Sequence, residues 1–126
     1  MTKIIKKNYK SSILILDKLD KKIKFKRIFF LIANKIDIRG KHAHKKCTQA
    51  FFSIRGSFLI ECINKKEKKK YLIKPGEKLR IIKPMNWVTV FLKKNDICAV
   101  LCDRHYEEND YIRDYKTFLK FKLNEK

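Results

Sequence analysis

The sequence has no apolar run long enough to cross a membrane. Its longest runs, at residues 28–33 and 97–101, are far shorter than the ~20 residues that a spanning helix requires. The amino terminus is basic, but the short apolar segment that follows is interrupted at Asp17 and lacks a small-residue cleavage site, unlike a secretory signal. We therefore expect a cytoplasmic protein without a membrane partner.

The cysteines lack the spacing of the common zinc and redox motifs. Cys47, Cys62, Cys98 and Cys102 form neither a C-x-x-C pair nor a zinc-ribbon pattern, and each lies in an apolar, strand-like context. We expect reduced, buried thiols.

Acidic residues are scarce, since 13 aspartates and glutamates accompany 33 lysines and arginines, which gives a formal charge of +20. A basic excess of this size can indicate binding to nucleic acid, acidic lipid or an anionic metabolite. However, the lysines are scattered over turns and ends, without a groove-reading helix or exposed aromatic residues alternating with basic ones. We expect a solvated basic surface and no nucleic-acid partner, with a nucleic-acid-binding module as a remaining alternative.

The 126 residues, of which 44% are hydrophobic, indicate one domain spanning residues 1–126. Strand-like segments recur at residues 9–16, 25–32, 39–54, 57–63, 71–73, 79–82, 87–92 and 97–102, with a loop at 33–38 and a lysine-rich hairpin tip at 64–70. Turn signals such as Arg55-Gly56 and Pro75-Gly76 separate them at near-regular spacing. This regular alternation of short strands and turns predicts an all-β sandwich or barrel.

The carboxyl-terminal segment, residues 107–121, breaks this pattern. Its apolar residues Tyr111, Tyr115, Phe118 and Leu119 have a helix-like spacing, and carboxylates precede them, as the amino-terminal turn of a helix favours. We expect a short carboxyl-terminal helix here.

Two of the three histidines, His42 and His44, are separated by one residue in a segment that becomes apolar and aromatic. A strand's period of two places both side chains on one face. Imidazole gives and takes protons near neutral pH, so a pair of them beside cationic residues predicts proton transfer on an anionic ligand. The alternative is a pair of hydrogen-bonded histidines in the core, which we rank below the catalytic interpretation because burying two unpartnered imidazoles beside Arg39 is costly.

The pattern of Gly40, His42, His44, Gln49 and Gly56 resembles the first motif of the cupin family, whose small jelly-roll β-barrels hold a divalent metal. The resemblance implies an all-β cupin fold with the short carboxyl-terminal helix added. Here Gln49 stands where the motif carries glutamate, and no histidine follows Pro84, where the second motif would supply one. Because two of four ligands are missing, we expect no metal and no other cofactor.

A closer resemblance covers nearly the whole chain. The blocks that carry it are Arg39-Gly40-x-His42-Ala43-His44-Lys45-Lys46, Phe52-x-Ile54-x-Gly56-Ser57-Phe58, Pro84-x-x-Trp87 and Asp110-Tyr111-Ile112-Arg113-Asp114-Tyr115. This combination is similar to the nucleotide-sugar 3,4-ketoisomerases, cupins that act on thymidine-diphosphate-linked 4-keto-6-deoxyglucose. The resemblance implies a metal-free homodimer with exchanged amino-terminal strands, here residues 9–16, in the synthesis of a 3-amino sugar for a surface glycan.

The resemblance assigns His42 and His44 as the catalytic acid–base pair, without deciding which of them abstracts the carbon-bound proton. Substrate-binding candidates are Arg39, Lys45 and Lys46 for the diphosphate, Gln49 for a sugar hydroxyl, and, in second rank, Trp87, Arg104, Tyr106 and Tyr111. On an unbroken strand Lys45 and Lys46 would face opposite ways, so we expect only one of them to reach the ligand. For Trp87 and Tyr111, core packing is an equally good interpretation.

One departure concerns the strand before the histidines, where relatives often carry a tyrosine and this chain has Phe29 and Phe30. Tyr9 or Tyr106 is a candidate replacement for that phenol. Tyr9 and Val88 are candidates for setting the configuration at C-4. Two other functions stay open: a 3,5-epimerase on the same substrate, which would pair one histidine with a distant aspartate, and a non-catalytic nucleotide-sugar-binding cupin.

Overall fold

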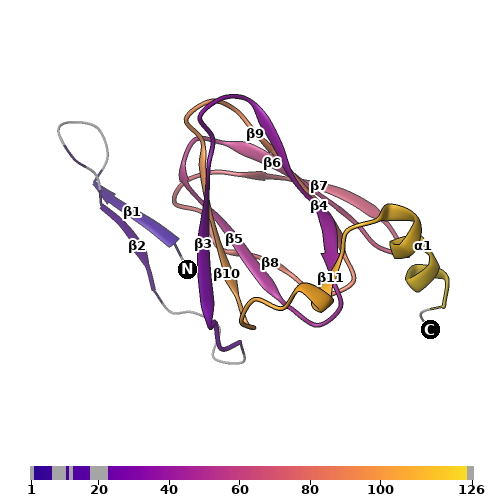
Figure 1. Ribbon diagram of the computed structural model, residues 1–126. Coiled ribbons are helices and arrows are strands. Elements are labelled where there is room, and N and C mark those ends of the chain that lie inside the picture. Colours follow the sequence, from indigo (N-terminus) through magenta and orange to yellow (C-terminus); the bar gives the residue numbers. More distant parts are fainter. Residues whose placement is uncertain (1, 7–10, 12, 18–22, 125–126) are drawn as a thin grey trace.

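The structure is a computed structural model that describes residues 2–6, 11, 13–17 and 23–124. The described chain consists mainly of strands (Figure 1), which confirms the expected all-β class. In chain order the elements are β1 (Thr2–Lys6), β2 (Ile13–Leu16), β3 (Arg27–Ile32), β4 (Asp37–His44), β5 (Gln49–Arg55), β6 (Phe58–Ile63), β7 (Lys68–Ile73), β8 (Arg80–Ile82), β9 (Trp87–Leu92), β10 (Ile97–Cys102), the 3-10 helix η1 (Glu108–Asp110), β11 (Tyr111–Ile112) and α1 (Tyr115–Asn124). No helix of this described part is long and apolar enough to cross a membrane.

Two antiparallel sheets face each other as a sandwich (Figure 1). One sheet has the strand order β3-β10-β5-β8, and the other has the order β11-β4-β9-β6-β7. Strands β1 and β2 form a separate two-stranded sheet beside β3, and α1 lies at the opposite side of the molecule, next to β11. The expected cupin-type architecture with a short carboxyl-terminal helix is confirmed, as a sandwich of two sheets.

The core lies between the two sheets. Phe51 of β5 pairs with Val100 of β10, while Ile60 of β6 pairs with Val90 of β9, and all four side chains are buried in one cluster. All four cysteines are buried and unpaired, as the sequence predicts. Alternation along each strand thus supplies the core from both sheets.

The outer face of the four-stranded sheet is apolar as well. Leu14 and Leu16 of β2 pack against Phe52 and Leu101 on this face. At the edge strand β3, alternate side chains remain uncovered: Ile28, Phe30 and Ile32 are 47%, 48% and 63% exposed. An apolar row on an edge strand is a surface that proteins normally cover.

Two ends of the chain differ from the sequence prediction. The expected first strand at 9–16 is β2, Ile13–Leu16, and residues 9, 10 and 12 lie outside the described part. The expected helix begins only at Tyr115, because Asp114 accepts hydrogen bonds from the backbone N–H of Thr117 (3.0 Å) and from its hydroxyl (2.9 Å), which caps the first turn. The residues before it form η1 and β11.

Other strand boundaries also move, and the expected strand at 39–54 is divided into β4, which ends at His44, and β5, which begins at Gln49. β4 begins at Asp37, within the expected loop, because Asp37 and Ile38 pair with β9. β7 begins at Lys68, so only residues 64–67 form the turn. Asn64 Oδ1 accepts the backbone N–H groups of Lys66 (2.9 Å) and Glu67 (3.1 Å), which fixes that turn.

Candidate active site

Strand β4 carries both histidines and bends sharply just before them. The β4–β9 register shifts between Gly40 and His42, and Gly40 has a φ of +86°. A Cβ at Gly40 would lie 2.7 Å from the carbonyl oxygen of Val88, so only glycine fits this close approach. Past the bend, the rings of His42 and His44 meet edge to face with centroids 5.2 Å apart.

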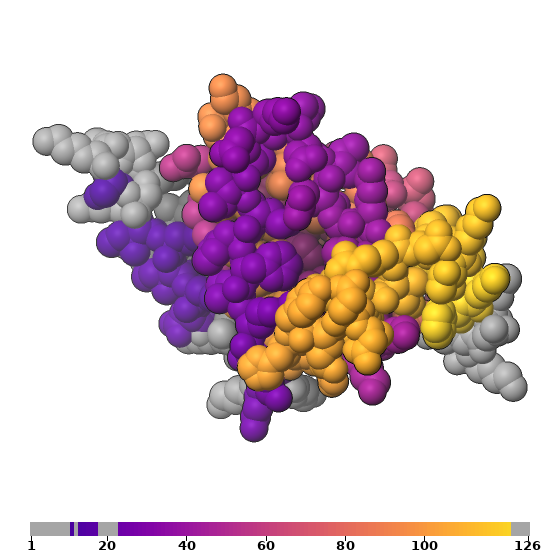
Figure 2. Space-filling model, viewed as in Figure 1, coloured from indigo at the N-terminus to yellow at the C-terminus, as the bar shows by residue number. Residues whose placement is uncertain are grey.

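A cavity of about 200 Å³ opens beside His42 between the two sheets. It is lined by Phe29, Leu31, Arg39, Gly40, His42, Gln49, Phe51, Val88, Val90, Tyr111 and Arg113. Its wall is therefore mostly apolar, with two guanidinium groups, one imidazole, one amide and one phenol. In Figure 2 the segment that follows β10, drawn in orange, lies at the front of the molecule beside the purple residues of β3 and β4.

His42 is held in one orientation by its own strand. Its Nδ1 lies 3.1 Å from the carbonyl oxygen of Gly40, and a carbonyl only accepts, so Nδ1 carries the proton and Nε2 is left as an acceptor. Burial, then the neighbouring His44 and Arg113, lower the pKa of His42 to about 4. The ring is neutral at pH 7, as a proton acceptor must be.

His44 is the more deeply buried imidazole, with 4% of its surface exposed. Its Nδ1 lies 3.0 Å from Oδ2 of Asp110, and its Nε2 is buried without a hydrogen-bond partner among the described residues. Burial lowers the pKa of His44, against the raising effect of the Asp110 carboxylate. A buried imidazole nitrogen without a partner is costly, which is typical of a group kept free for chemistry.

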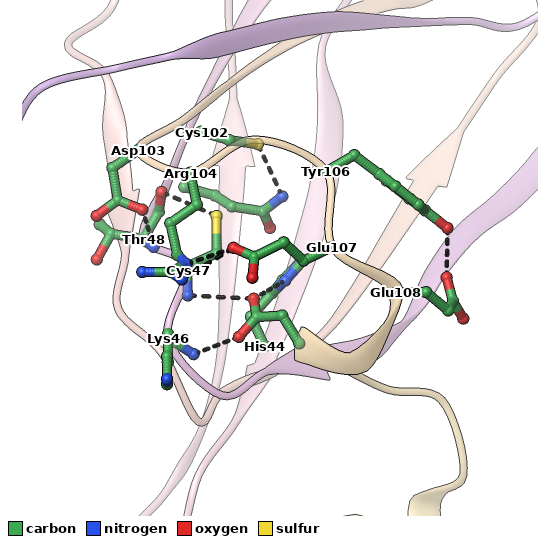
Figure 3. Close-up of polar contacts among 12 residues, drawn as sticks. His44, Lys46, Cys47, Thr48, Cys102, Asp103, Arg104, Tyr106, Glu107 and Glu108 are labelled. Atoms are coloured by element: carbon green, nitrogen blue, oxygen red, sulfur yellow. Dashed lines mark hydrogen bonds and ion pairs between the residues drawn. The ribbon is translucent and has the colours of Figure 1, made fainter.

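Tyr111 packs against both histidines from β11. Its ring centroid lies 5.0 Å from that of His42 and 4.3 Å from that of His44. The guanidinium of Arg113 lies over the Tyr111 ring at 4.1 Å and makes two hydrogen bonds to Glu108, at 2.7 and 2.9 Å. Tyr106 also donates its hydroxyl to Glu108, as Figure 3 shows. The segment after β10 therefore closes one side of the cavity with an aromatic and charged layer.

The structure brings some of the sequence candidates to the cavity. His42, Arg39, Gln49 and Tyr111 line it, and so does Val88, whereas His44 does not line it but contacts the ring of His42. Gln49 is buried, and its amide donates to the sulfur of Cys102 at 3.4 Å. Tyr9 lies outside the described residues.

The remaining candidates lie outside the cavity in this chain. β4 ends at His44, so Lys45 and Lys46 are not on the strand; the Lys45 ammonium lies 5.6 Å from the Phe121 ring, and Lys46 contributes a backbone N–H to Asp110. Trp87 packs against Tyr115 and Phe118, which agrees with the alternative that its side chain serves core packing. Arg104 forms an ion pair with Glu107 at 2.9 Å, and the Tyr106 side chain is exposed.

Some residues of the site, among them Phe29, Asp110 and Arg113, were not among the candidates. Phe29 lines the cavity, while its neighbour Phe30 points to the outer face. Asp110 and Arg113 belong to the Asp110–Tyr115 block, which the sequence analysis placed before or within a helix. The sequence feature that could have identified Asp110 and Arg113 is this block, because it resembles the same family as the histidine block. The local sequence, however, does not show that the block pairs with β4.

Within the described part of the chain, His44, Cys47 and Asp110 are a group that could hold a metal ion, because one ligand atom of each lies within 4.8 Å of the others. The Asp110 oxygens and the Cys47 thiol are already engaged. Both Asp110 oxygens accept hydrogen bonds, and a hydrogen bond with Cys102, together with burial, raises the pKa of the Cys47 thiol and keeps it protonated. The donor set fits a hydrogen-bonded cluster better than a metal centre, and the absence of a metal stays a prediction.

Comparison with known proteins places this site in a family. The family model described as FdtA, WxcM-like, C-terminal, matches residues 1–123. No curated protein sequence matches the chain.

Several solved structures resemble the chain over nearly its whole length. WlaRA from Campylobacter jejuni, a TDP-fucose-3,4-ketoisomerase, is 30% identical, with a TM-score of 0.80 over 98% of this chain and 93% of its own. QdtA from Thermoanaerobacterium thermosaccharolyticum, a sugar 3,4-ketoisomerase in complex with TDP, is 26% identical, with a TM-score of 0.83 over 98% of this chain and 91% of its own. A 3,4-ketoisomerase from Helicobacter canadensis is 28% identical, with a TM-score of 0.79 over 97% of each chain.

Proposed function

The chain belongs to the FdtA family (WxcM-like, C-terminal), and we propose that it is a 3,4-ketoisomerase that converts TDP-4-keto-6-deoxyglucose into its 3-keto isomer. The observation that carries the proposal is that His42 lines a cavity between the two sheets and that its ring contacts the ring of His44. Identity of 25–30% to sugar 3,4-ketoisomerases over nearly the whole chain supports the reaction. A histidine-to-asparagine variant of QdtA in complex with TDP-4-keto-6-deoxyglucose supports the substrate.

The reaction is a redistribution of protons. A base removes the proton from C-3 while the carbonyl oxygen at C-4 gains one, which gives an enediol. The C-3 hydroxyl then loses its proton as it becomes the new carbonyl, and C-4 gains a proton on carbon. Because His42 and His44 are both neutral and adjacent, one can act on the carbon-bound proton while the other serves the oxygens.

The ligand contacts are assigned by what faces the cavity. Arg39 lies at its exposed rim, where a planar guanidinium suits a diphosphate. Gln49 is buried deeper, and its amide is the group for a sugar hydroxyl. Tyr111 supplies a phenol beside the histidines, whereas the neighbouring wall position on β3 is Phe29.

We extend the proposal to a homodimer with exchanged amino-terminal strands. β1 and β2 form a sheet of their own, so exchanging them between chains breaks no ladder hydrogen bond of the two main sheets. The exposed row Ile28, Phe30 and Ile32 on β3 would be covered in such a dimer. Light scattering during gel filtration should give twice the mass of one chain. A monomer at micromolar concentration would contradict this part of the proposal.

The proposal also covers the compartment of the protein and the use of its product. The four unpaired thiols suit the reducing cytoplasm. The 3-keto product is the form that an amino-transfer step requires, so the reaction would feed a 3-amino sugar into a surface glycan.

A 3,5-epimerase on the same substrate is a second candidate. The observation that favours it is the His44–Asp110 pair, since a histidine backed by a distant aspartate is the arrangement expected of that reaction. The test for both is the proton spectrum of TDP-4-keto-6-deoxyglucose incubated with the protein in heavy water. A new 3-keto species supports the isomerase, exchange at C-3 and C-5 without keto migration supports the epimerase, and an unchanged spectrum with bound ligand leaves a non-catalytic binding protein.

A further inference from the structure

Asp110 is a buried carboxylate whose oxygens are all used within the site. Oδ1 accepts the backbone N–H of Lys46 at 2.7 Å, and Oδ2 accepts the backbone N–H of Cys47 at 3.3 Å. Oδ2 also lies 3.0 Å from Nδ1 of His44. Figure 3 shows His44, Lys46 and Cys47 gathered at these contacts. The side chain is 7% exposed, so water does not compete for these bonds.

The backbone of Asp110 is fixed too. Its N–H donates to the carbonyl of Glu107 at 3.0 Å, and its carbonyl accepts the N–H of Lys45 at 2.9 Å. The residue after it, Tyr111, pairs with His44 in the β11–β4 ladder. The carboxylate therefore has one position relative to the imidazole, set by main-chain bonds on both sides.

This position decides which nitrogen of His44 carries the proton. An ionised carboxylate only accepts hydrogen bonds, so the proton lies on Nδ1 and the lone pair lies on Nε2. Nε2 is the nitrogen that is buried without a partner among the described residues. When Nε2 takes a proton, the Asp110 carboxylate faces the new positive charge across a 3.0 Å hydrogen bond.

His42 lacks such a partner, because its Nδ1 faces the neutral carbonyl of Gly40. We infer that Asp110 is a positioning residue that holds His44 in its Nδ1–H tautomer and stabilises the imidazolium formed when His44 accepts a proton. The inference rests on the proposed isomerase function and assigns a role to a residue that does not itself face the cavity.

Other charged and titratable groups also face His44, and each stays in place in the variants below. They are His42 on its own strand, Arg27 on β3, Tyr111 on β11, Cys47 before β5 and Arg113 after β11.

The chain offers a matched control for the structural part of the role. Asp103 accepts the backbone N–H of Thr48 at 2.8 Å, and its own N–H donates to the Thr48 carbonyl at 3.1 Å. It therefore anchors the same β4–β5 connection from the other end of the segment after β10, as Figure 3 shows. These hydrogen bonds of Asp103, within the described part of the chain, involve no histidine.

The experiment compares D110N and D103N in the full-length protein. TDP affinity is measured by calorimetry, and kcat and KM are measured with TDP-4-keto-6-deoxyglucose. We expect D110N to lower kcat by about 100-fold or more, with KM and TDP affinity within about twofold, since general acid–base help is lost while ground-state contacts remain. D103N should keep kcat within about threefold at most, because only a main-chain anchor is weakened. Equal kcat values in the two variants, or a D110N effect confined to KM, overturn the inference.

A second measurement does not depend on the D110N variant. Nitrogen chemical shifts of 15N-labelled imidazoles report the tautomer of each histidine, and His44→Asn identifies the His44 signals by their loss. We expect the proton on Nδ1 of His44 in the wild-type protein. A proton on Nε2 overturns the inference, even if D110N does not fold. Failure of the proposed function is distinguishable, because wild-type protein would then give no 3-keto product while the tautomer is still read.

Discussion

Tyr111 lies directly opposite His44 in the β11–β4 ladder, with the two ring centroids 4.3 Å apart. A two-residue strand thus brings a phenol from the carboxyl-terminal segment to the histidine pair. β11 ends at Ile112 and α1 begins at Tyr115, and the Tyr111 ring forms part of the cavity wall beside the histidines. This single pairing joins the two family blocks of the sequence into one site.

Replacing Tyr111 by phenylalanine should keep the ring packing and remove the hydroxyl. We expect kcat to fall by about tenfold or more with an unchanged melting temperature, because Tyr111 is the phenol that lines the cavity beside the imidazoles. Steady-state kinetics and thermal unfolding check this. The matched control is Tyr115→Phe, whose ring packs on Trp87 away from the cavity. Equal kcat values for the two variants would remove the Tyr111 hydroxyl from the mechanism.

Replacing Arg39 by alanine should weaken ligand binding rather than the chemical step. Its guanidinium at the cavity rim is the proposed diphosphate clamp, and a clamp acts on ground state and transition state alike. We expect KM to rise by about tenfold or more with kcat little changed. Arg55→Ala, at the exposed end of β5, controls for the loss of one positive charge. If both variants raise KM equally, the diphosphate binds elsewhere.

Stability should fall on acidification before the carboxylates titrate. The pKa of His42 is lowered from 6.5 to about 4, chiefly by burial, so below pH 6.5 the unfolded chain binds a proton that the folded chain does not. The free energy of unfolding therefore decreases as pH falls from 6.5 towards 4, and His44, also lowered, adds to the decrease. Urea unfolding at pH 7 and pH 5 measures this. The free energy of unfolding should decrease more between pH 7 and pH 5 in the wild type than in the His42→Asn, His44→Asn double variant. An equal or smaller decrease in the wild type would contradict the prediction.

Dialysis against a chelator should leave the activity intact. Gln49 is an amide that already donates a hydrogen bond to Cys102, and Asp110 is satisfied by hydrogen bonds. Turnover and metal content are measured together after dialysis with EDTA. Activity that is lost on dialysis and restored by one divalent ion would contradict the prediction of a metal-free enzyme.

Period-two alternation was enough to predict most of the sandwich, because strands such as β9 and β10 each place every second side chain in a shared core. It failed where pairing between distant segments overrides local spacing. Tyr111 and Tyr115 have a helical spacing, yet the backbone of Tyr111 pairs with β4, and the helix starts only after the Asp114 cap. Local sequence carries no information on that pairing.

The same limit applies to the site. The H-x-H pattern on a strand predicted two adjacent imidazoles, and the structure has them in contact. Sequence proximity does not predict which cations line the cavity, since Lys45 and Lys46 follow His44 directly but lie beyond the end of β4 and do not line it. Asp110, which contacts His44, is 66 residues away in the chain, so only the fold reveals the contact.

In the proposed reaction, His42 and His44 move protons between C-3 and C-4 of a bound keto sugar. The most direct test is the proton spectrum of TDP-4-keto-6-deoxyglucose in heavy water with the wild-type protein, His42→Asn and His44→Asn, after calorimetry has shown that each binds TDP. We predict that the wild type forms the 3-keto isomer and that each variant binds TDP but forms none. Full conversion by both variants, or exchange at C-5 without keto migration in the wild type, would contradict the account.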